Sequence, residues 1–214
     1  MSAADKAAYL ADVVDALKLK WPEYQRVNIV CDGHSVPAGY FDPPMVDSLN
    51  AYPHLLHLAL KERFPFALMN VINTAIAAEH SEQGAARFDR VIGPRPDVVT
   101  IDYGLNDRSI GLERARSAWV QMIEAAIAAN AKVILLTATA DTREPPDQGV
   151  LNEHAAEIRE LAAAYGTGLV DSLARFKSHA ETALMSDLMS AANHPNRRGH
   201  ELVAEELLRW FAWG

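Results

Sequence analysis

The sequence lacks several features that mark large classes of protein. It has one cysteine, Cys31, so no disulfide can form within the chain, and we interpret this residue as a small buried side chain at a strand end. No apolar run approaches the roughly 20 residues that a membrane-spanning helix needs. Residues 1 to 20 carry charges throughout and do not have the basic start and apolar stretch of a secretory signal. We therefore expect a soluble, cytoplasmic protein with no membrane partner.

Excess positive charge and nucleotide-binding motifs are also missing. The chain has 20 Lys and Arg against 28 Asp and Glu, a net charge of −8. Nucleic-acid binding depends on clustered Lys and Arg, so we expect no nucleic-acid partner. No GxGxxG or GxxxxGK[ST] motif follows an expected strand, which argues against nucleotide binding. His54 and His57 lie three residues apart without a companion carboxylate or cysteine motif, so we expect no metal and no cofactor.

The composition is that of one globular domain. The chain has 214 residues, of which 50% are apolar, and we expect residues 1–214 to form a single domain. Short apolar runs typical of strands occur at 27–31, 66–72, 98–102, 133–137 and 168–170. Apolar residues at helical spacing, or helix-start signals, predict helices near 4–19, 52–63, 111–129, 148–165 and 197–212.

Strands and helices alternate along the whole chain. Continuous apolar strands joined by helices predict a parallel sheet covered on both faces, which is a three-layer α/β/α sandwich. In open parallel sheets ligands bind at the carboxyl ends of the strands. The loops that follow the strands are therefore the first place to look for a site, and the proline-rich segment 141–149 is interpreted as a surface loop bordering it.

Polar blocks follow three of the expected strands or precede the last helix. They read DGHS at 32–35, NTAIAAEHS at 73–81, YGLND at 103–107 and NHPNRRGH at 193–200. A serine hydroxyl becomes a good nucleophile only when a nearby base takes its proton and donors are aimed at the developing oxyanion. These blocks offer Ser35 as the nucleophile and His194 as the base.

The same blocks offer donors for an oxyanion hole. We expect the backbone N–H of Ser35, the side-chain amide of Asn106 and the backbone N–H of Ala75 to form it. Further residues are expected to shape the supporting loops: Gly33, Asn73 and Gly104.

The order of these blocks, from Gly-x-Ser through Gly-x-Asn-Asp to His-Pro-Asn-x-x-Gly-His, resembles the SGNH hydrolases, also called GDSL-type esterases. The resemblance spans residues 33–200. It implies a flavodoxin-like, five-stranded parallel sheet of order 2-1-3-4-5, no metal, and ester hydrolysis through an acyl-enzyme intermediate. It also implies that Ser35 is the catalytic serine, Asn106 the oxyanion-hole asparagine and His194 the catalytic histidine.

The sequence departs from the family pattern at three positions. His34 stands where the family usually has aspartate, Ala75 where it has the oxyanion glycine, and Ala191 where it has the triad acid. Asp187, seven residues before His194, is the expected replacement acid, because a carboxylate would fix the imidazole tautomer and stabilise the imidazolium. The alternative is a dyad in which a backbone carbonyl accepts from the far ring nitrogen.

The polar loops and the lack of an obvious apolar lid predict a small, polar ester as the substrate. We expect a serine esterase that removes O-acetyl groups, on a carbohydrate or a similar alcohol. The alternatives are a thioesterase or lysophospholipase, and a non-catalytic binding module on the same fold, which Ala75 and Ala191 make conceivable. The apolar end LLRWFAWG, 207–214, is interpreted as a helix packed on the sheet, with a homo-oligomer interface as the alternative.

Overall fold

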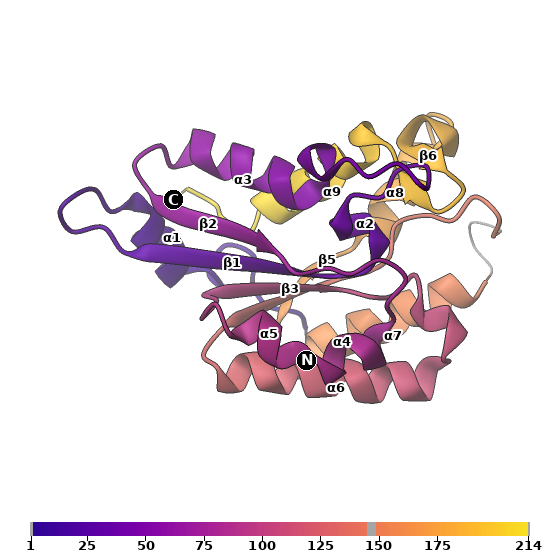
Figure 1. Cartoon of the computed structure of the whole chain (residues 1–214), viewed down its shortest axis with the longest axis horizontal. Coiled ribbons are helices and arrows are strands. Elements are labelled where there is room, and N and C mark those ends of the chain that lie inside the picture. The colour runs from indigo at the N-terminus through magenta and orange to yellow at the C-terminus, as the bar shows by residue number, and fades with distance from the viewer. Residues whose placement is uncertain (1, 145–148, 214) are drawn as a thin grey trace.

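The centre of the molecule is a five-stranded parallel sheet in the order β2-β1-β3-β4-β5 (Figure 1). The computed structural model describes residues 2–144 and 149–213. The strands are β1 Arg26–Gly33, β2 Leu68–Asn73, β3 Val98–Asp102, β4 Lys132–Leu136 and β5 Gly168–Val170. The strand order 2-1-3-4-5 and the α/β class expected from the sequence are both confirmed.

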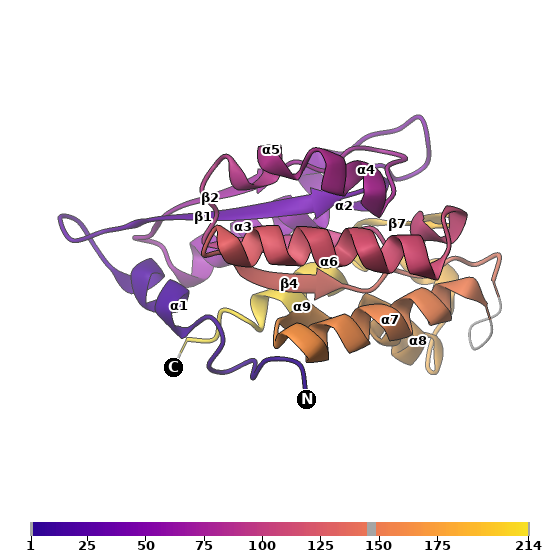
Figure 2. The same cartoon turned by 90° about the horizontal axis from the view of Figure 1, so that it is seen from below.

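Helices cover both faces of the sheet and complete three layers. One face carries α3 Tyr52–Arg63, α8 Ser172–Ala180 and α9 Arg197–Leu208, and α1 Ala11–Lys18 joins the same core beside β1. The opposite face carries α4 Ser81–Ala86, α5 Phe88–Ile92, α6 Leu112–Ala128 and α7 Val150–Tyr165 (Figure 2).

Two apolar cores lie on the two faces of the sheet. Successive strand side chains point to opposite faces, so Ile29 belongs to the core under α3 and α9, whereas Val30 belongs to the core under α6. Because both faces are covered, β3 is buried along its whole length, which explains why its sequence is mostly apolar. Cys31 is fully buried, and burial raises the pKa of its thiol to about 12. The thiol therefore stays protonated at neutral pH, in agreement with its interpretation as a small core side chain.

The differences from the expected elements concern short pieces and helix ends. The first helix begins at Ala11 rather than at residue 4, and the last ends at Leu208 rather than at 212. The expected helix start at residue 148 lies outside the described residues, and α7 begins at Val150. The short helices α2 Ser35–Ala38, α4 and α5 and the helix α8 were not predicted. Among the described residues, no helix is long and apolar enough to cross a membrane.

Most of the apolar C-terminal segment packs inside the chain. Leu207, Trp210 and Phe211 are buried, whereas the side chain of Trp213 is 56% exposed and stacks on Phe64. The packing of the last helix against the sheet, favoured from the sequence, is therefore what the structure shows.

The last block of the sequence forms a small separate unit that the sequence did not predict. After the 3-10 turn η3, Met185–Leu188, the strands β6, Met189–Ala191, and β7, His194–Pro195, pair antiparallel outside the main sheet. Two further 3-10 turns, η1 Ser48–Asn50 and η2 Asp107–Ser109, lie in loops. The unit of β6 and β7 is called the His194 hairpin below.

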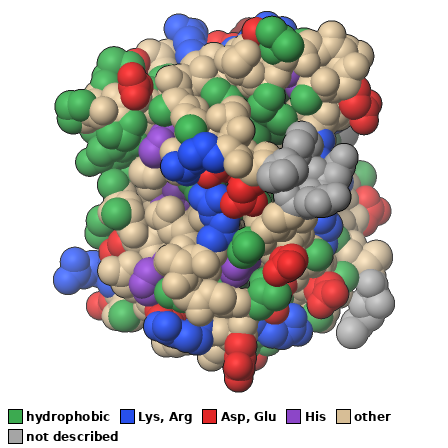
Figure 3. All heavy atoms as spheres, turned by 90° about the vertical axis from the view of Figure 1, so that its right-hand side faces the viewer, with side chains coloured by type: hydrophobic (Ala, Val, Ile, Leu, Met, Phe, Trp, Pro, Cys, Tyr) green, Lys and Arg blue, Asp and Glu red, His purple; other side chains and the backbone are tan. Residues whose placement is uncertain are grey.

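The carboxyl ends of the strands lie at the right-hand side of Figure 1. Figure 3 faces this end and shows basic and acidic side chains gathered at its middle, with histidines beside them. The polar blocks of the sequence follow strands that end here, so this end is where a site is to be sought.

Candidate active site

Ser35 and His194 meet at the carboxyl end of the sheet. Ser35 Oγ lies 2.9 Å from His194 Nε2, although the residues are 159 positions apart in the chain. Both are nearly buried, with exposed fractions of 9% and 8%. The distance is that of a hydrogen bond, so the imidazole is placed to take the proton of the hydroxyl.

The turn from β1 into α2 depends on glycines at both ends. A Cβ on Gly33 would lie 2.3 Å from the carbonyl oxygen of Asp102 on the neighbouring strand. Gly39 ends α2 with a φ of +93°, and a Cβ there would lie 2.7 Å from Ser48 Cα. Only glycine fits at these two positions, and the pair holds Ser35 on the first turn of a one-turn helix.

The His194 hairpin is fixed by hydrogen bonds on both sides. Ser190 Oγ lies 3.1 and 3.0 Å from the carbonyl oxygens of His194 and Pro195, and its single hydroxyl proton can be donated to either. The N–H of Thr142, in the loop after β4, donates to the carbonyl oxygen of Ala192 at 2.8 Å. Asn196 caps α9 by accepting from the Gly199 N–H at 3.1 Å. The segment 141–149 thus borders the site where it is described; residues 145–148 lie outside the described part.

The environment of His194 favours the neutral ring. Burial lowers the pKa of its imidazole, and the nearby His34 and Arg143 lower it further, while Asp42 and Asp141 act in the opposite sense. A histidine with a lowered pKa is a free base at neutral pH. His194 is therefore in the state that can accept a proton from Ser35.

The expected contact between Asp187 and His194 is not formed. Asp187 lies on η3 with its side chain exposed, while its neighbour Leu188 fills the buried position and turns the carboxylate outward. The backbone oxygen of Asp187 instead accepts from Asn196 Nδ2 at 2.9 Å. His194 Nδ1 is buried and has no hydrogen-bond partner within the described parts of the chain, so the alternative backbone-carbonyl acceptor is not in place either.

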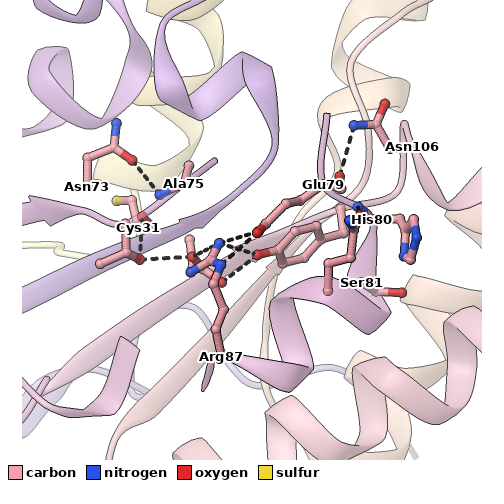
Figure 4. Close-up of polar contacts among 12 residues, drawn as sticks. Cys31, Asn73, Ala75, Glu79, His80, Ser81, Arg87 and Asn106 are labelled. Atoms are coloured by element: carbon pink, nitrogen blue, oxygen red, sulfur yellow. Dashed lines mark hydrogen bonds and ion pairs between the residues drawn. The ribbon is translucent and has the colours of Figure 1, made fainter. Parts of the chain in front are cut away.

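The three expected oxyanion donors differ in whether their N–H groups are already hydrogen-bonded within the protein. Asn106 Nδ2 donates to the carbonyl oxygen of Glu79 at 2.9 Å, which uses one of its two N–H groups. The N–H of Ala75 donates to Asn73 Oδ1 at 3.1 Å and is therefore occupied (Figure 4). The N–H of Ser35 lies at the start of α2, where a helix offers unsatisfied donors.

Asn73 supports the site by linking the loop after β2 to α2 through two side-chain hydrogen bonds. Its Nδ2 donates to the carbonyl oxygen of Pro37 in α2 at 2.6 Å, while its Oδ1 holds the Ala75 N–H. The loop after β2 is thereby fastened to the helix that carries Ser35. Gly104 packs closely against α7, because a Cβ there would lie 3.0 Å from Ile158 Cδ1.

A buried charged network holds the loop that carries Asn106, and sequence reasoning missed it. Asp32 is fully buried; it accepts from Tyr103 Oη at 2.7 Å and lies 3.1 Å from Arg87 Nη2. Arg87 in turn pairs with the Glu79 carboxylate at 2.6 Å, and the backbone carbonyl oxygen of Glu79 accepts the hydrogen bond from the Asn106 side chain (Figure 4). Asp32, in the DGHS block at a buried strand end, was a signal for such a network, since a buried carboxylate needs partners.

Asp107 braces the same loop from the other side. It is fully buried and accepts from the Ser81 N–H at 2.7 Å and from the Trp119 indole at 2.6 Å. The loop after β3 is thereby held against α4 and α6. Asn106 sits between two rigid anchors, which is what a preorganised donor requires.

An open depression of about 510 Å³ lies beside Asn106. Its lining consists of Ala78, Leu105, Asn106, Arg108 and Ser109. Arg108 pairs with Asp141 at 3.0 Å and with Glu144, so the guanidinium is held at the rim. Within residues 2–144 and 149–213, no group of three or more His, Cys, Asp or Glu side chains is arranged to hold a metal ion.

A serine and a histidine in hydrogen-bond contact at the carboxyl edge of a doubly covered parallel sheet have the geometry that a serine hydrolase needs. Residues 31–202 match the model of the GDSL-like lipase/acylhydrolase family. The chain belongs to this family and is by that membership a carboxylic ester hydrolase.

Solved structures share the fold. An acetylxylan esterase from Geobacillus stearothermophilus superposes with a TM-score of 0.77 at 19% identity, covering 88% of this chain and 95% of that one. A two-domain esterase active on acetylated mannans gives a TM-score of 0.77 at 21% identity, covering 95% of this chain and 52% of that one. The chain thus spans about half of the two-domain protein. No curated protein sequence matches it.

Proposed function

We propose that the chain is a serine esterase that removes small acyl groups, above all O-acetyl groups, from carbohydrate. The observation that carries the proposal is the 2.9 Å contact between Ser35 Oγ and His194 Nε2 at the carboxyl end of the sheet, where Asn106 borders an open depression. Membership in the acylhydrolase family supports ester hydrolysis at this pair.

The geometry supports a two-stage reaction. His194 Nε2 takes the proton of Ser35 while Oγ bonds to the acyl carbon, and the Ser35 N–H and the Asn106 amide stabilise the oxyanion. The imidazolium then gives its proton to the alcohol oxygen as the C–O bond breaks, which leaves an acyl-enzyme. A water molecule repeats the sequence: His194 accepts its proton, hydroxide adds to the acyl carbon, and Ser35 leaves with that proton.

The proposed substrate follows from the lining of the depression and from the relatives. Its lining includes the polar side chains of Asn106, Arg108 and Ser109, which suit hydroxyl groups better than an acyl chain. The similar structures come from enzymes that act on acetylated xylan and on acetylated mannans.

A covalent probe tests whether the chain is a catalyst. A fluorophosphonate should label the native protein and a Ser186→Ala variant equally, because Ser186 is an exposed serine on η3. It should leave Ser35→Ala unlabelled. Absence of labelling in the native protein would support the binding module instead.

A substrate series tests the acyl and alcohol preference. We expect kcat/KM to fall from p-nitrophenyl acetate to the butyrate and octanoate, and acetylated xylo-oligosaccharides to be deacetylated by the native protein but not by Ser35→Ala. A preference for octanoate would support a lysophospholipase, and a preference for an acetyl thioester over these oxygen esters would support a thioesterase.

A further inference from the structure

His34, directly before the proposed nucleophile, is a buried histidine to which the reaction above gives no role. Its side chain is 1% exposed and contacts Ser35, Val36 and Asp102. We propose that His34 is a positioning residue that, together with Asp102 and Tyr52, keeps the Ser35 oxygen free to attack. This proposal rests on the proposed function, because it requires Ser35 to be a nucleophile.

The contacts of His34 fix which ring nitrogen carries the proton. Nδ1 lies 3.2 Å from the backbone N of Val36, which can only donate, so Nδ1 must present its lone pair. The proton of the neutral ring is therefore on Nε2. Nδ1 is also 3.5 Å from Ser35 Oγ, and in this tautomer it has no hydrogen to give to that oxygen.

A buried carboxylate stands at the other end of the ring. His34 Nε2 lies 3.5 Å from Asp102 Oδ1, longer than a regular hydrogen bond, and this buried oxygen has no hydrogen-bond partner among the described residues. Tyr52 Oη donates to the second carboxylate oxygen, Oδ2, at 3.2 Å. Asp102 is 3% exposed and Tyr52 is fully buried, so the carboxylate depends on these neighbours to offset its loss of water.

The backbone holds the pair in register. Gly33 and Asp102 are paired residues of the adjacent strands β1 and β3, and the N–H of His34 donates to the Asp102 carbonyl oxygen at 3.3 Å. Both residues therefore sit at the rigid ends of central strands. The imidazole has little room to turn away from either Ser35 or the carboxylate.

The tautomer of His34 decides whether the Ser35 oxygen accepts a hydrogen bond. With its proton on Nε2, facing Asp102, His34 leaves the lone pairs of the Ser35 oxygen without a donor and the hydroxyl proton directed at His194, 2.9 Å away. If the His34 proton moved to Nδ1, that N–H would donate to Ser35 Oγ, weaken its nucleophilicity, and oppose the Val36 N–H. Asp102 prevents this shift because a carboxylate accepts and cannot donate.

A simple capping role accounts for only part of these contacts. Asparagine at position 34 would also accept from the Val36 N–H, since it is among the best N-cap residues. Capping does not need a desolvated carboxylate behind the ring. The variant His34→Asn therefore separates the two roles, because it keeps the cap and removes the connection to Asp102.

The experiment compares His34→Asn, Asp102→Asn and the double variant with the native protein. A matched control is Asp171→Asn, which removes a carboxylate that caps α8 and pairs with Arg159 away from Ser35. The readouts are the rate of fluorophosphonate labelling, kcat and KM for p-nitrophenyl acetate, and the thermal unfolding midpoint.

We expect each single variant to label and turn over about 100-fold more slowly, the scale of misplacing a reacting group by about 1 Å, with KM changed less than about threefold. The double variant should be no slower than the singles, as residues acting as one unit behave. The control should stay within about twofold of native.

Two results overturn the proposal: His34→Asn reacting at the native rate, or single effects that multiply in the double variant. If the Asp102 variants do not fold, Tyr52→Phe removes one donor to the same carboxylate, and we expect about a tenfold lower kcat at unchanged KM. A folded Tyr52→Phe with native kcat also overturns it. Failure of the proposed function is a separate outcome, since the native protein would then not be labelled.

Discussion

Replacing Asp187 with asparagine tests how far the catalytic pair works without an acid. The side chain of Asp187 is exposed on η3, and the Nδ1 of His194 has no partner among the residues that the structure describes. The substitution removes the charge and keeps the size of the side chain. We expect kcat/KM to change by no more than about twofold.

The magnitude follows from the surroundings of Asp187. Exposed ion pairs are typically worth about 0.2–1 kcal/mol, and the solvated Asp187 carboxylate makes no hydrogen bond to His194 Nδ1, so we take about 0.5 kcal/mol as its limit, which salt reduces further. Since each tenfold in rate corresponds to 1.36 kcal/mol, the upper limit is about twofold. A carboxylate that orients the histidine of a triad is worth up to about 10⁴-fold. The two cases differ by orders of magnitude, so one kinetic measurement separates them.

The assay is kcat/KM for p-nitrophenyl acetate in native protein, Asp187→Asn and a control, Glu181→Gln, which neutralises another exposed carboxylate nearby in the sequence. Equal values in all three support a Ser35–His194 dyad. A loss above about 100-fold in Asp187→Asn alone would refute the reasoning, because it would mean that η3 rearranges and brings the carboxylate to His194 Nδ1 when substrate binds.

Three other predictions concern the donors and the pH dependence. Removing the amide in Asn106→Ala should lower kcat by about 10²- to 10³-fold with little change in KM, measured on the same ester. Because burial lowers the pKa of His194 from 6.5 and only the neutral ring accepts a proton, kcat/KM should rise with pH through a midpoint below 6.5; a midpoint above 6.5 would contradict this. Burial also lowers the pKa of His200 from 6.5 to about 3. As the pH falls below 6.5, His200 therefore becomes protonated in the unfolded chain while it stays neutral in the folded protein. The free energy of unfolding in urea should therefore drop by about 2 kcal/mol between pH 7 and pH 5 from this group, and His200→Asn should lose that component.

The central sheet was predictable because its signals are local or carried by the family resemblance. The mostly apolar residues of β3 are buried on both faces, and the family resemblance carried by the polar blocks implied the strand order 2-1-3-4-5. The sequence also pointed to Ser35 and His194, and the structure brings them together: Ser35 follows β1 directly, and His194 reaches it from β7, which lies outside the main sheet.

The detailed arrangement of the site was not predictable, because it depends on side chains and short segments that hydrophobic periodicity does not reveal. The position of Asp187 follows from which of two neighbours is buried, and Leu188 takes that place. The N–H of Ala75 was expected to be free, but the side chain of Asn73, two residues earlier, reaches it. Such choices are decided by local competition between hydrogen-bond partners, and a sequence pattern does not report its outcome.

The His194 hairpin has a consequence for how the protein fails under stress. In the described structure its strands pair with each other and not with the main sheet, and its ties to the rest of the molecule include the two hydrogen bonds from Thr142 to the Ala192 carbonyl oxygen. A fluctuation that frees this segment costs far less than melting the central sheet, yet it carries the imidazole away from the serine. In a denaturant titration, hydrolysis should therefore vanish while the circular dichroism of the helices is still intact, so that inactive molecules accumulate that are almost entirely folded.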